Sequence, residues 1–237
     1  MKSSHRILEA DIAAQRRYYD RLWVDVPAVR LNAHERARLD AIESTLEWLS
    51  AREPRPWSIA EVGCGRGWLS GLLLSRYGRV EAFDLSPDSI AKAQAAFPHV
   101  HFESQDVLAS PVTARKDLVV SSEVIEHIGD QRSFVEKLVS AVRPGGWVLV
   151  TTPNGRVARS YQRRPGFRPQ PIENVLEPRE LVALLRPTCR SVRVETFFFG
   201  QGNGALQRLV RAGRLSAETA RRLRLGLYLL VLAQRRT

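Results

Sequence analysis

The spacing of apolar residues divides the chain into a helical first part and a longer part of mixed structure. Before residue 52, apolar side chains recur every three or four positions in a charged stretch, as along one buried face of a surface helix: Leu39, Ile42, Leu46 and Leu49. From Trp57 onward, short apolar runs alternate with helical stretches. The pattern predicts an N-terminal helical cap over 1–52, interrupted near Pro27, and then an α/β domain.

The alternation is most regular up to residue 152. The expected strands are 58–62, 79–84, 99–102, 117–121 and 146–152, and the expected helices are 66–76, 86–97 and 131–142. Ser86 and Pro87 are residues favoured at the N-cap and the first position of a helix. Strands that alternate with helices require right-handed crossovers. We therefore expect a doubly wound, Rossmann-like sheet with helices on both faces.

This rhythm ends after Asn154. The rest of the chain predicts a loop rich in Pro and Arg, a short helix, a strand, a basic helix and a last strand: 155–176, 178–185, 191–199, about 204–223 and 225–233. The last strand is expected to be antiparallel to the one before it, which gives a seven-stranded, mostly parallel α/β sheet. We expect one domain over 1–237, with 53–154 as its regular half and 204–223 as a late helical insertion.

The strongest local motif is a glycine loop between the first expected strand and the following helix. From Glu61 to Gly67 it reads Glu-Val-Gly-Cys-Gly-Arg-Gly. Glycines let the backbone turn sharply and approach a ligand at the carboxyl edge of the sheet, where doubly wound folds bind ligands. A dinucleotide fingerprint would need a glycine where Trp68 stands, so a pyrophosphate site is disfavoured.

Two carboxylates follow the next two strands. Asp84 ends the second strand, where a carboxylate can accept hydrogen bonds from both hydroxyls of a ribose. Asp106 follows the third strand, where an acid can accept from an exocyclic amine while apolar neighbours enclose a ring. A single Asp in a loop is also common in plain turns. The order of the motifs favours a nucleoside site.

These residues, with Ser121 to Ile128 and Arg143 to Gly146, resemble the class I S-adenosylmethionine-dependent methyltransferases from about 57 to 154. The resemblance implies the Rossmann-like fold and S-adenosylmethionine as cofactor, with 53–154 as the cofactor-binding half and 155–237 as the basic acceptor side. It implies these cofactor contacts: Glu61, Gly63, Gly65 and Gly67 around the methionyl part, Asp84 at the ribose, Leu85, Asp106 and Val107 at the adenine, and Ser122 and Glu123 near the sulfonium.

Glu123, Glu126 and His127 allow three interpretations. Their spacing would place them on one face of a helical turn beside the cofactor. His127 could be the general base that takes a proton from a hydroxyl acceptor, with Glu126 beside it. All three could instead bind a divalent cation that lowers the pKa of the acceptor. They could also simply fix the loop.

The same stretch is similar to that of quinone-pathway O-methyltransferases and of small-RNA 2′-O-methyltransferases, where such residues hold a metal. The RNA enzymes add a second histidine before the short helix. Here that segment reads Pro171 to Leu176 without histidine, and none follows His127. The departure argues against an RNA-terminus enzyme and against a bound metal, so we assign no metal ligands.

The N-terminal part contains an aromatic helix, from Arg16 to Trp23, that resembles the cap of small-molecule members of the family. Tyr19 or Trp23 could then lie near the methionyl group. An amphipathic helix whose aromatic residues pack on the sheet is an equally good interpretation.

Charge adds one constraint. The chain has 36 Lys and Arg against 25 Asp and Glu, but residues 1–154 are close to neutral and 155–237 carry 17 basic and 5 acidic residues. The excess therefore lies on the expected acceptor side, in the loop 155–176, a candidate lid, and in 204–223. An anionic acceptor, an acidic carrier and a membrane surface are all open. The absence of aromatics among the arginines of 204–223 argues against single-stranded nucleic acid.

Compartment signals are weak. Cys64 and Cys189 are too few for a disulfide framework, and no apolar run reaches the length of a signal sequence or of a membrane span. We expect a cytoplasmic protein. The sequence predicts methyl transfer to a small molecule, most directly to a hydroxyl oxygen. A nucleic-acid methyltransferase, a small-molecule N-methyltransferase and a catalytically silent binding module are the alternatives.

Overall fold

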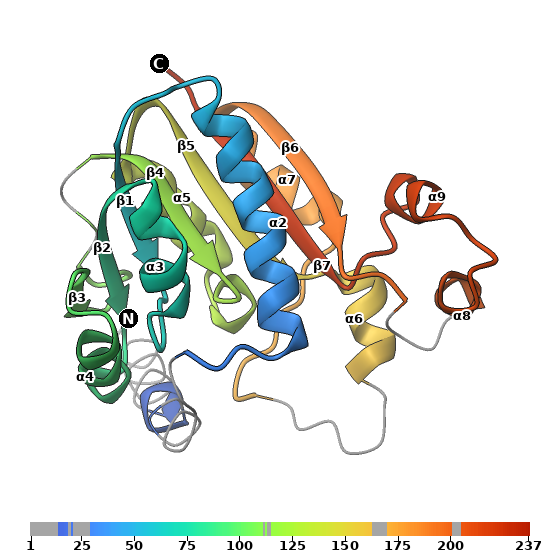
Figure 1. Cartoon of the computed structure of the whole chain (residues 1–237), viewed down its shortest axis with the longest axis horizontal. Helices are drawn as coiled ribbons and strands as arrows, with labels where there is room; N and C mark the ends of the chain where they lie inside the picture. The colour runs from blue at the N-terminus through green and yellow to red at the C-terminus, as the bar shows by residue number, and fades with distance from the viewer. Residues whose placement is uncertain are drawn as a thin grey trace, which may run out of the picture.

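A computed structural model describes residues 14–18, 20, 29–110, 112, 115–162, 170–200 and 205–237. The strands form one seven-stranded sheet in the order β3-β2-β1-β4-β5-β7-β6 (Figure 1). Their bounds are β1 Trp57–Val62, β2 Gly78–Asp84, β3 His101–Ser104, β4 Lys116–Ser122, β5 Val142–Pro153, β6 Cys189–Phe197 and β7 Tyr228–Arg235. The first five strands are parallel, and β7 is antiparallel to both β5 and β6. The expected mostly parallel sheet with an antiparallel last strand is confirmed.

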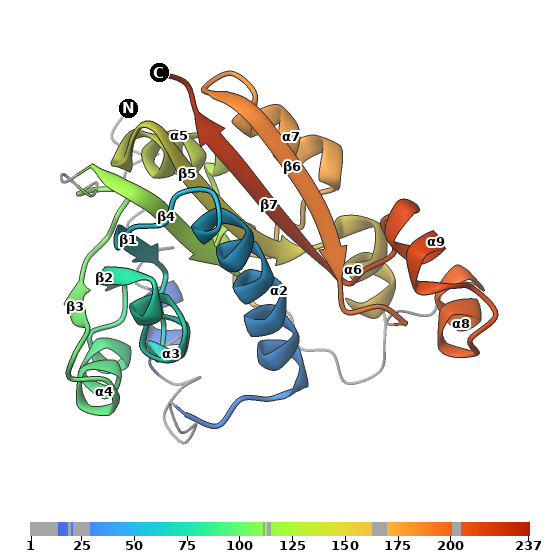
Figure 2. The same ribbon diagram turned by 45° about the horizontal axis from the view of Figure 1, so that its top comes forward.

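Helices cover both faces of this sheet, as predicted (Figures 1 and 2). Their bounds are α2 Ala33–Ser50, α3 Trp68–Leu72, α4 Pro87–Ala96, α5 Gln131–Ala141, α6 Gly155–Gln162, α7 Pro178–Leu185, α8 Ala205–Arg211 and α9 Ala217–Arg222, with 3₁₀ turns η1 Leu74–Arg76 and η2 Ile125–His127. Buried side chains of α2, α3 and α4 share one apolar core, and those of α5 and α7 share the other.

Alternation along the strands builds these two cores. In β5, Leu149 belongs to the core under α2, whereas Val148 and Val150 belong to the core under α5. In β7, Leu230 and Val231 divide in the same way. Successive side chains of a strand point to opposite faces, so uninterrupted apolar runs mark strands buried on both sides. Ile42 of α2 is fully buried, which confirms the apolar face expected for this helix.

Several strands are shifted or extended relative to their expected ranges: β3 from 99–102, β5 from 146–152, β6 from 191–199 and β7 from 225–233. Two predicted elements differ more. The helix expected over 66–76 divides into α3 and η1 at Leu73, whose φ of −124° and ψ of −61° are not helical. The loop expected over 155–176 begins instead with the helix α6. Asn154 caps this helix, since its Oδ1 accepts from the Arg156 N–H at 3.2 Å, and the buried Val157 and Ala158 face the core.

The basic helix expected over 204–223 is two short helices, α8 and α9. Gly213 separates them with a φ of +67°, a conformation that few residues other than glycine adopt. Ser216 then caps α9 by accepting from the Thr219 N–H. Two helices joined by a turn therefore stand where the sequence suggested one continuous helix.

Candidate functional site

A cavity of about 420 Å³ opens at the carboxyl ends of β1, β2 and β4. Eleven of the predicted site residues line it: Glu61, Gly63, Gly65, Asp84, Leu85, Asp106, Val107, Ser122, Glu123, Glu126 and His127. Gly67 does not line it. It is the N-cap residue of α3, with a φ of +73°, and an added Cβ would lie 2.7 Å from the Phe102 ring. Gly67 therefore shapes the loop, and its predicted contact with the cofactor stays a prediction.

The glycine loop is held against β2 by its own backbone. The N–H groups of Gly63 and Cys64 both donate to the carbonyl of Phe83, at 2.7 and 3.0 Å. Gly63 has a φ of +79°, and a Cβ there would lie 2.2 Å from Val124. At Gly65, with a φ of +51°, a Cβ would meet nothing within 4 Å. The loop thus packs tightly at its start and leaves open space at its centre.

Asp84 joins this loop to the helix that follows β2. Its Oδ2 accepts from the Gly65 N–H at 2.7 Å, and its Oδ1 accepts from the Ser86 N–H at 2.9 Å. Each carboxylate oxygen can accept a second hydrogen bond. Burial raises the pKa of Asp84 above its ordinary value. The carboxylate therefore has capacity left for two hydroxyl donors in the cavity.

Asp106 closes a tight turn after β3. Its Oδ1 accepts from the N–H groups of Leu108 and Ala109, at 2.8 and 3.3 Å. The turn interpretation that the sequence left open is therefore part of its role. Val107 and Leu108 line the cavity beside it, so the turn also brings apolar side chains to the site.

Glu61 lies at the end of β1 and is almost completely buried. The Ser70 hydroxyl donates to its Oε2 at 2.5 Å. Burial raises the pKa of Glu61 to about 8, while the bond from Ser70 acts in the opposite direction. At neutral pH the group is mostly protonated and can offer a hydrogen-bond donor as well as acceptors.

Glu123 adopts a left-handed backbone conformation, with a φ of +59°, directly after β4. Its N–H donates to the carbonyl of Thr151, and its Oε1 accepts from the hydroxyl of the same residue at 3.2 Å. Arg38 lies 3.9 Å from its Oε2. Burial raises the pKa of Glu123 to about 8 although the Arg38 charge lowers it. A strained residue held by two contacts is typical of a functional position.

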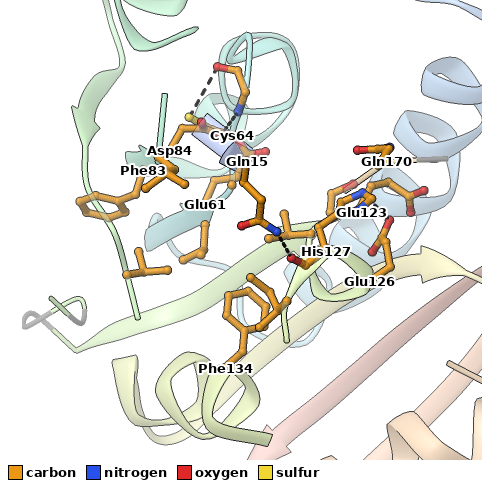
Figure 3. Close-up of a pocket in the computed structure, with 18 of the residues that line it drawn as sticks. Gln15, Glu61, Cys64, Phe83, Asp84, Glu123, Glu126, His127, Phe134 and Gln170 are labelled. Carbon is orange, nitrogen blue, oxygen red and sulfur yellow. Dashed lines mark hydrogen bonds and ion pairs between the residues drawn. The ribbon is translucent and has the colours of Figure 1, made fainter. Parts of the chain in front are cut away.

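Glu126 and His127 lie together across the cavity from Asp84 (Figure 3). The Thr152 hydroxyl donates to Glu126 Oε2 at 2.9 Å, and Glu126 Oε1 lies 3.6 Å from His127 Nε2. Burial raises the pKa of Glu126 to about 7 and lowers that of His127. The three residues therefore lie close together, as predicted, but they do not share one helical turn: Glu126 and His127 belong to η2, whereas Glu123 precedes it.

The orientation of His127 is fixed from both sides. Its Nδ1 lies 2.8 Å from the carbonyl of Ile172, and its own carbonyl accepts from Gln15 Nε2 at 2.6 Å. A carbonyl oxygen can only accept, so Nδ1 carries the proton. The lone pair of the neutral ring therefore belongs to Nε2, the atom near Glu126.

In the described part of the chain, no group of three or more His, Cys, Asp or Glu residues is arranged to hold a metal ion. No described helix is both long and apolar enough to cross a bilayer.

Several lining residues were not singled out from the sequence. Gln15 comes from the helical residues 14–18, and Arg38 comes from α2. The Arg38 guanidinium lies 5.9 Å from the Trp68 ring centroid and 5.5 Å from that of Tyr228. Tyr228 begins β7, about 160 residues after Trp68. No local motif announces this cluster, because its members meet through tertiary packing.

The predicted lid is described in part. Arg156 and Arg159 on α6 lie 3.8 and 3.5 Å from the carboxylate of Glu177. Residues 163–169 lie outside the described part of the chain, as do Tyr19 and Trp23. The proposed roles of these residues therefore stay predictions.

A buried ion pair fastens the glycine loop to α2, and we expect it to dominate local stability. Arg66 lies 2.5 Å from Glu35, with side chains 2% and 6% exposed. Arg66→Met should lower the free energy of unfolding by about 3 kcal/mol, because it leaves a buried carboxylate without its partner. Urea unfolding measures this.

Arg222→Met is the matched control, since Arg222 pairs with Glu218 while 78% exposed. It should change stability little. Glu35→Gln combined with Arg66→Met should recover part of the loss. A single Arg66→Met variant as stable as wild type would show that the pair contributes nothing.

Comparison with known proteins finds methyltransferases in the family model, among the sequence relatives and among the solved structures. The model of a family described as "Methyltransferase domain" matches residues 33–187. A ubiquinone biosynthesis O-methyltransferase of Methylobacterium sp. (strain 4-46) is 39% identical over 44% of this chain and 43% of its own length. A probable chloroplastic tocopherol O-methyltransferase of Oryza sativa subsp. japonica is 32% identical over 53% of this chain and 38% of its own. The chain thus matches less than half the length of these curated relatives.

Among solved structures, the N-methyltransferase NodS of Bradyrhizobium japonicum WM9, in complex with S-adenosyl-L-homocysteine, has a similar fold. Its TM-score is 0.65 at 17% identity, and the match covers 94% of this chain and 98% of that one. This likeness confirms the Rossmann-like architecture.

Proposed function

Because the chain belongs to the methyltransferase-domain family over residues 33–187, we propose that it is an S-adenosylmethionine-dependent methyltransferase that acts on a small molecule, at a hydroxyl oxygen. One observation carries this proposal. The glycine loop and Asp84 are joined at Gly65 on one side of a cavity whose other side carries Glu126 and His127. A nucleoside-binding surface and a proton acceptor thus face one space.

The residues present fit the cofactor. Gly65 leaves room that a Cβ would fill, and Asp84 keeps acceptor capacity suited to a ribose diol. Leu85 and Val107 supply apolar surface for a ring. S-adenosylmethionine, when bound, supplies a methyl group activated on a sulfonium. The chain then needs to align an acceptor and remove its proton.

We assign proton removal to His127. Its Nδ1 is committed to Ile172, and its lowered pKa leaves Nε2 unprotonated at neutral pH. Glu126, 3.6 Å from Nε2, can stabilise the imidazolium once the proton has arrived. Ser122 and Glu123 line the same cavity. O-methylation is also what the names of the two curated relatives state for those proteins.

The test has two steps. The purified chain should bind S-adenosylmethionine in a calorimetric titration, and it should release S-adenosylhomocysteine faster with catechol than with aniline. Absence of cofactor binding would overturn the methyltransferase assignment. Binding followed by preferred transfer to aniline would overturn the hydroxyl assignment and leave the enzyme class intact.

A further inference from the structure

A small helical projection extends beyond the end of β6. In both views α8, α9 and the residues between and after them, 205–224, lie away from the sheet and near α6 (Figures 1 and 2). Ala220 of α9 is fully buried, and Asn154 Nδ2 donates to the carbonyl of Arg224 at 3.0 Å. We call residues 205–224 the arginine projection. It is fastened at its base, and its six arginines are exposed.

The arginine projection is strongly cationic. It contains one acidic residue, Glu218, which pairs with Arg222. Against it stand six arginines, all exposed: Arg208, Arg211, Arg214, Arg221, Arg222 and Arg224. Such a local excess of positive charge attracts a surface of the opposite sign within a Debye length of about 10 Å.

The same segment also exposes apolar side chains. In the described part of the chain, three large hydrophobic residues are exposed, and two of them belong to the projection. These are Leu209, 38% exposed on α8, and Leu223, 46% exposed directly after α9. Leucines among arginines suit the boundary between lipid headgroups and acyl chains, where both kinds of side chain are stabilised.

We propose that the arginine projection docks this protein on an anionic lipid bilayer. Nucleic acid fits less well, because residues 205–224 include no aromatic side chain on which a base could stack. A purely electrostatic partner would also leave Leu209 and Leu223 in water without a role.

The position of the projection connects docking with the cavity. Asn154, which holds the carbonyl of Arg224, follows Pro153, and Pro153 lines the cavity together with Ala158 and Tyr228. Docking through the projection therefore brings this side of the cavity close to the headgroups. Given the proposed methyl transfer, on which this step rests, the methyl acceptor is an amphiphile held in the bilayer leaflet on which the protein docks.

Vesicle flotation of the full chain tests docking without cofactor or acceptor. We expect binding to vesicles of equal parts phosphatidylglycerol and phosphatidylcholine, release at high salt, and no binding to phosphatidylcholine alone. Replacing Arg214, Arg221 and Arg224 by glutamine should lower the partition coefficient about 100-fold, at about fivefold for each arginine. Leu209→Ser with Leu223→Ser should weaken binding at low salt without changing the net charge.

The control variant removes the same number of positive charges from exposed positions outside the arginine projection, by replacing Arg79, Arg132 and Arg186 with glutamine. It should bind nearly as wild type does. Docking is overturned if anionic vesicles do not bind, if the control loses as much affinity as the test variant, or if poly(U) competes the chain off the vesicles. Cofactor titration of the same variants separates this failure from failure of the proposed function.

Discussion

Asp84→Asn is expected to weaken binding of S-adenosylmethionine about 1,000-fold. The carboxylate accepts the Gly65 and Ser86 N–H groups and has one further acceptor site on each oxygen. Asparagine replaces one of these oxygens by an NH₂ donor, which removes two charge-assisted bonds. Each is worth about 1.5–3 kcal/mol, and a loss of about 4 kcal/mol corresponds to this factor. Calorimetric titration measures the change.

Asp88→Asn is the control for this experiment. Asp88 is exposed in the first turn of α4, so the substitution removes the same charge four residues away without touching the loop. Its affinity should match wild type. Because Asp84 also holds the glycine loop, melting temperatures accompany each titration. A folded Asp84→Asn variant with unchanged affinity would remove Asp84 from the cofactor site.

His127→Asn is expected to lower kcat about 1,000-fold at neutral pH with catechol as acceptor, within the range typical for loss of a general base. The pH profile identifies the base. A base is active when it has lost its proton, so activity rises with pH through the pKa of the group. Burial lowers the pKa of His127 below 6.5, which places the rise on the acid side of that value.

Glu126→Gln separates the two neighbouring groups. If Glu126 were the base, its pKa of about 7 would place the rise near neutral pH, and Glu126→Gln would abolish it. With His127 as base, Glu126→Gln should lower kcat more modestly and keep the rise. His101→Asn, at a histidine 63% exposed on β3, should change nothing. A His127→Asn variant with the wild-type profile would falsify the assignment.

The glycine loop and Asp84 could be predicted because their physical requirements act within a few residues. The turn at Gly63 and Gly65 needs backbone conformations that glycine adopts, and the carboxylate at Asp84 needs to end a strand. Each requirement leaves a pattern that can be read along the chain. Glu61, Ser122 and Glu123, which also line the cavity, were expected from the family resemblance and not from a physical requirement of this kind.

The rest of the cavity lining could not be predicted in this way. Arg38, Trp68 and Tyr228 meet across three distant segments, and Gln15 reaches His127 from 112 residues away. Their contacts depend on how α2 and β7 pack on the sheet, which no local pattern encodes. Two local features were also not predicted. Gly213 interrupts the expected helix over 204–223, and Asn154 caps a helix where a loop was expected. In both segments the arginine-rich pattern was given more weight than the glycine and the N-cap residue.

The position of β7 has a consequence for how the chain folds. β6 pairs with β7 and with no other described strand, so it has no partner until residues 228–235 have been synthesised. Until then the edges of β5 and β6 that β7 later covers are open to other chains. Strands β1 to β5 can pair as soon as β5 emerges, whereas β6 and the arginine projection wait for β7. Folding on the ribosome should therefore proceed in two stages, with chaperone protection needed in the interval between them.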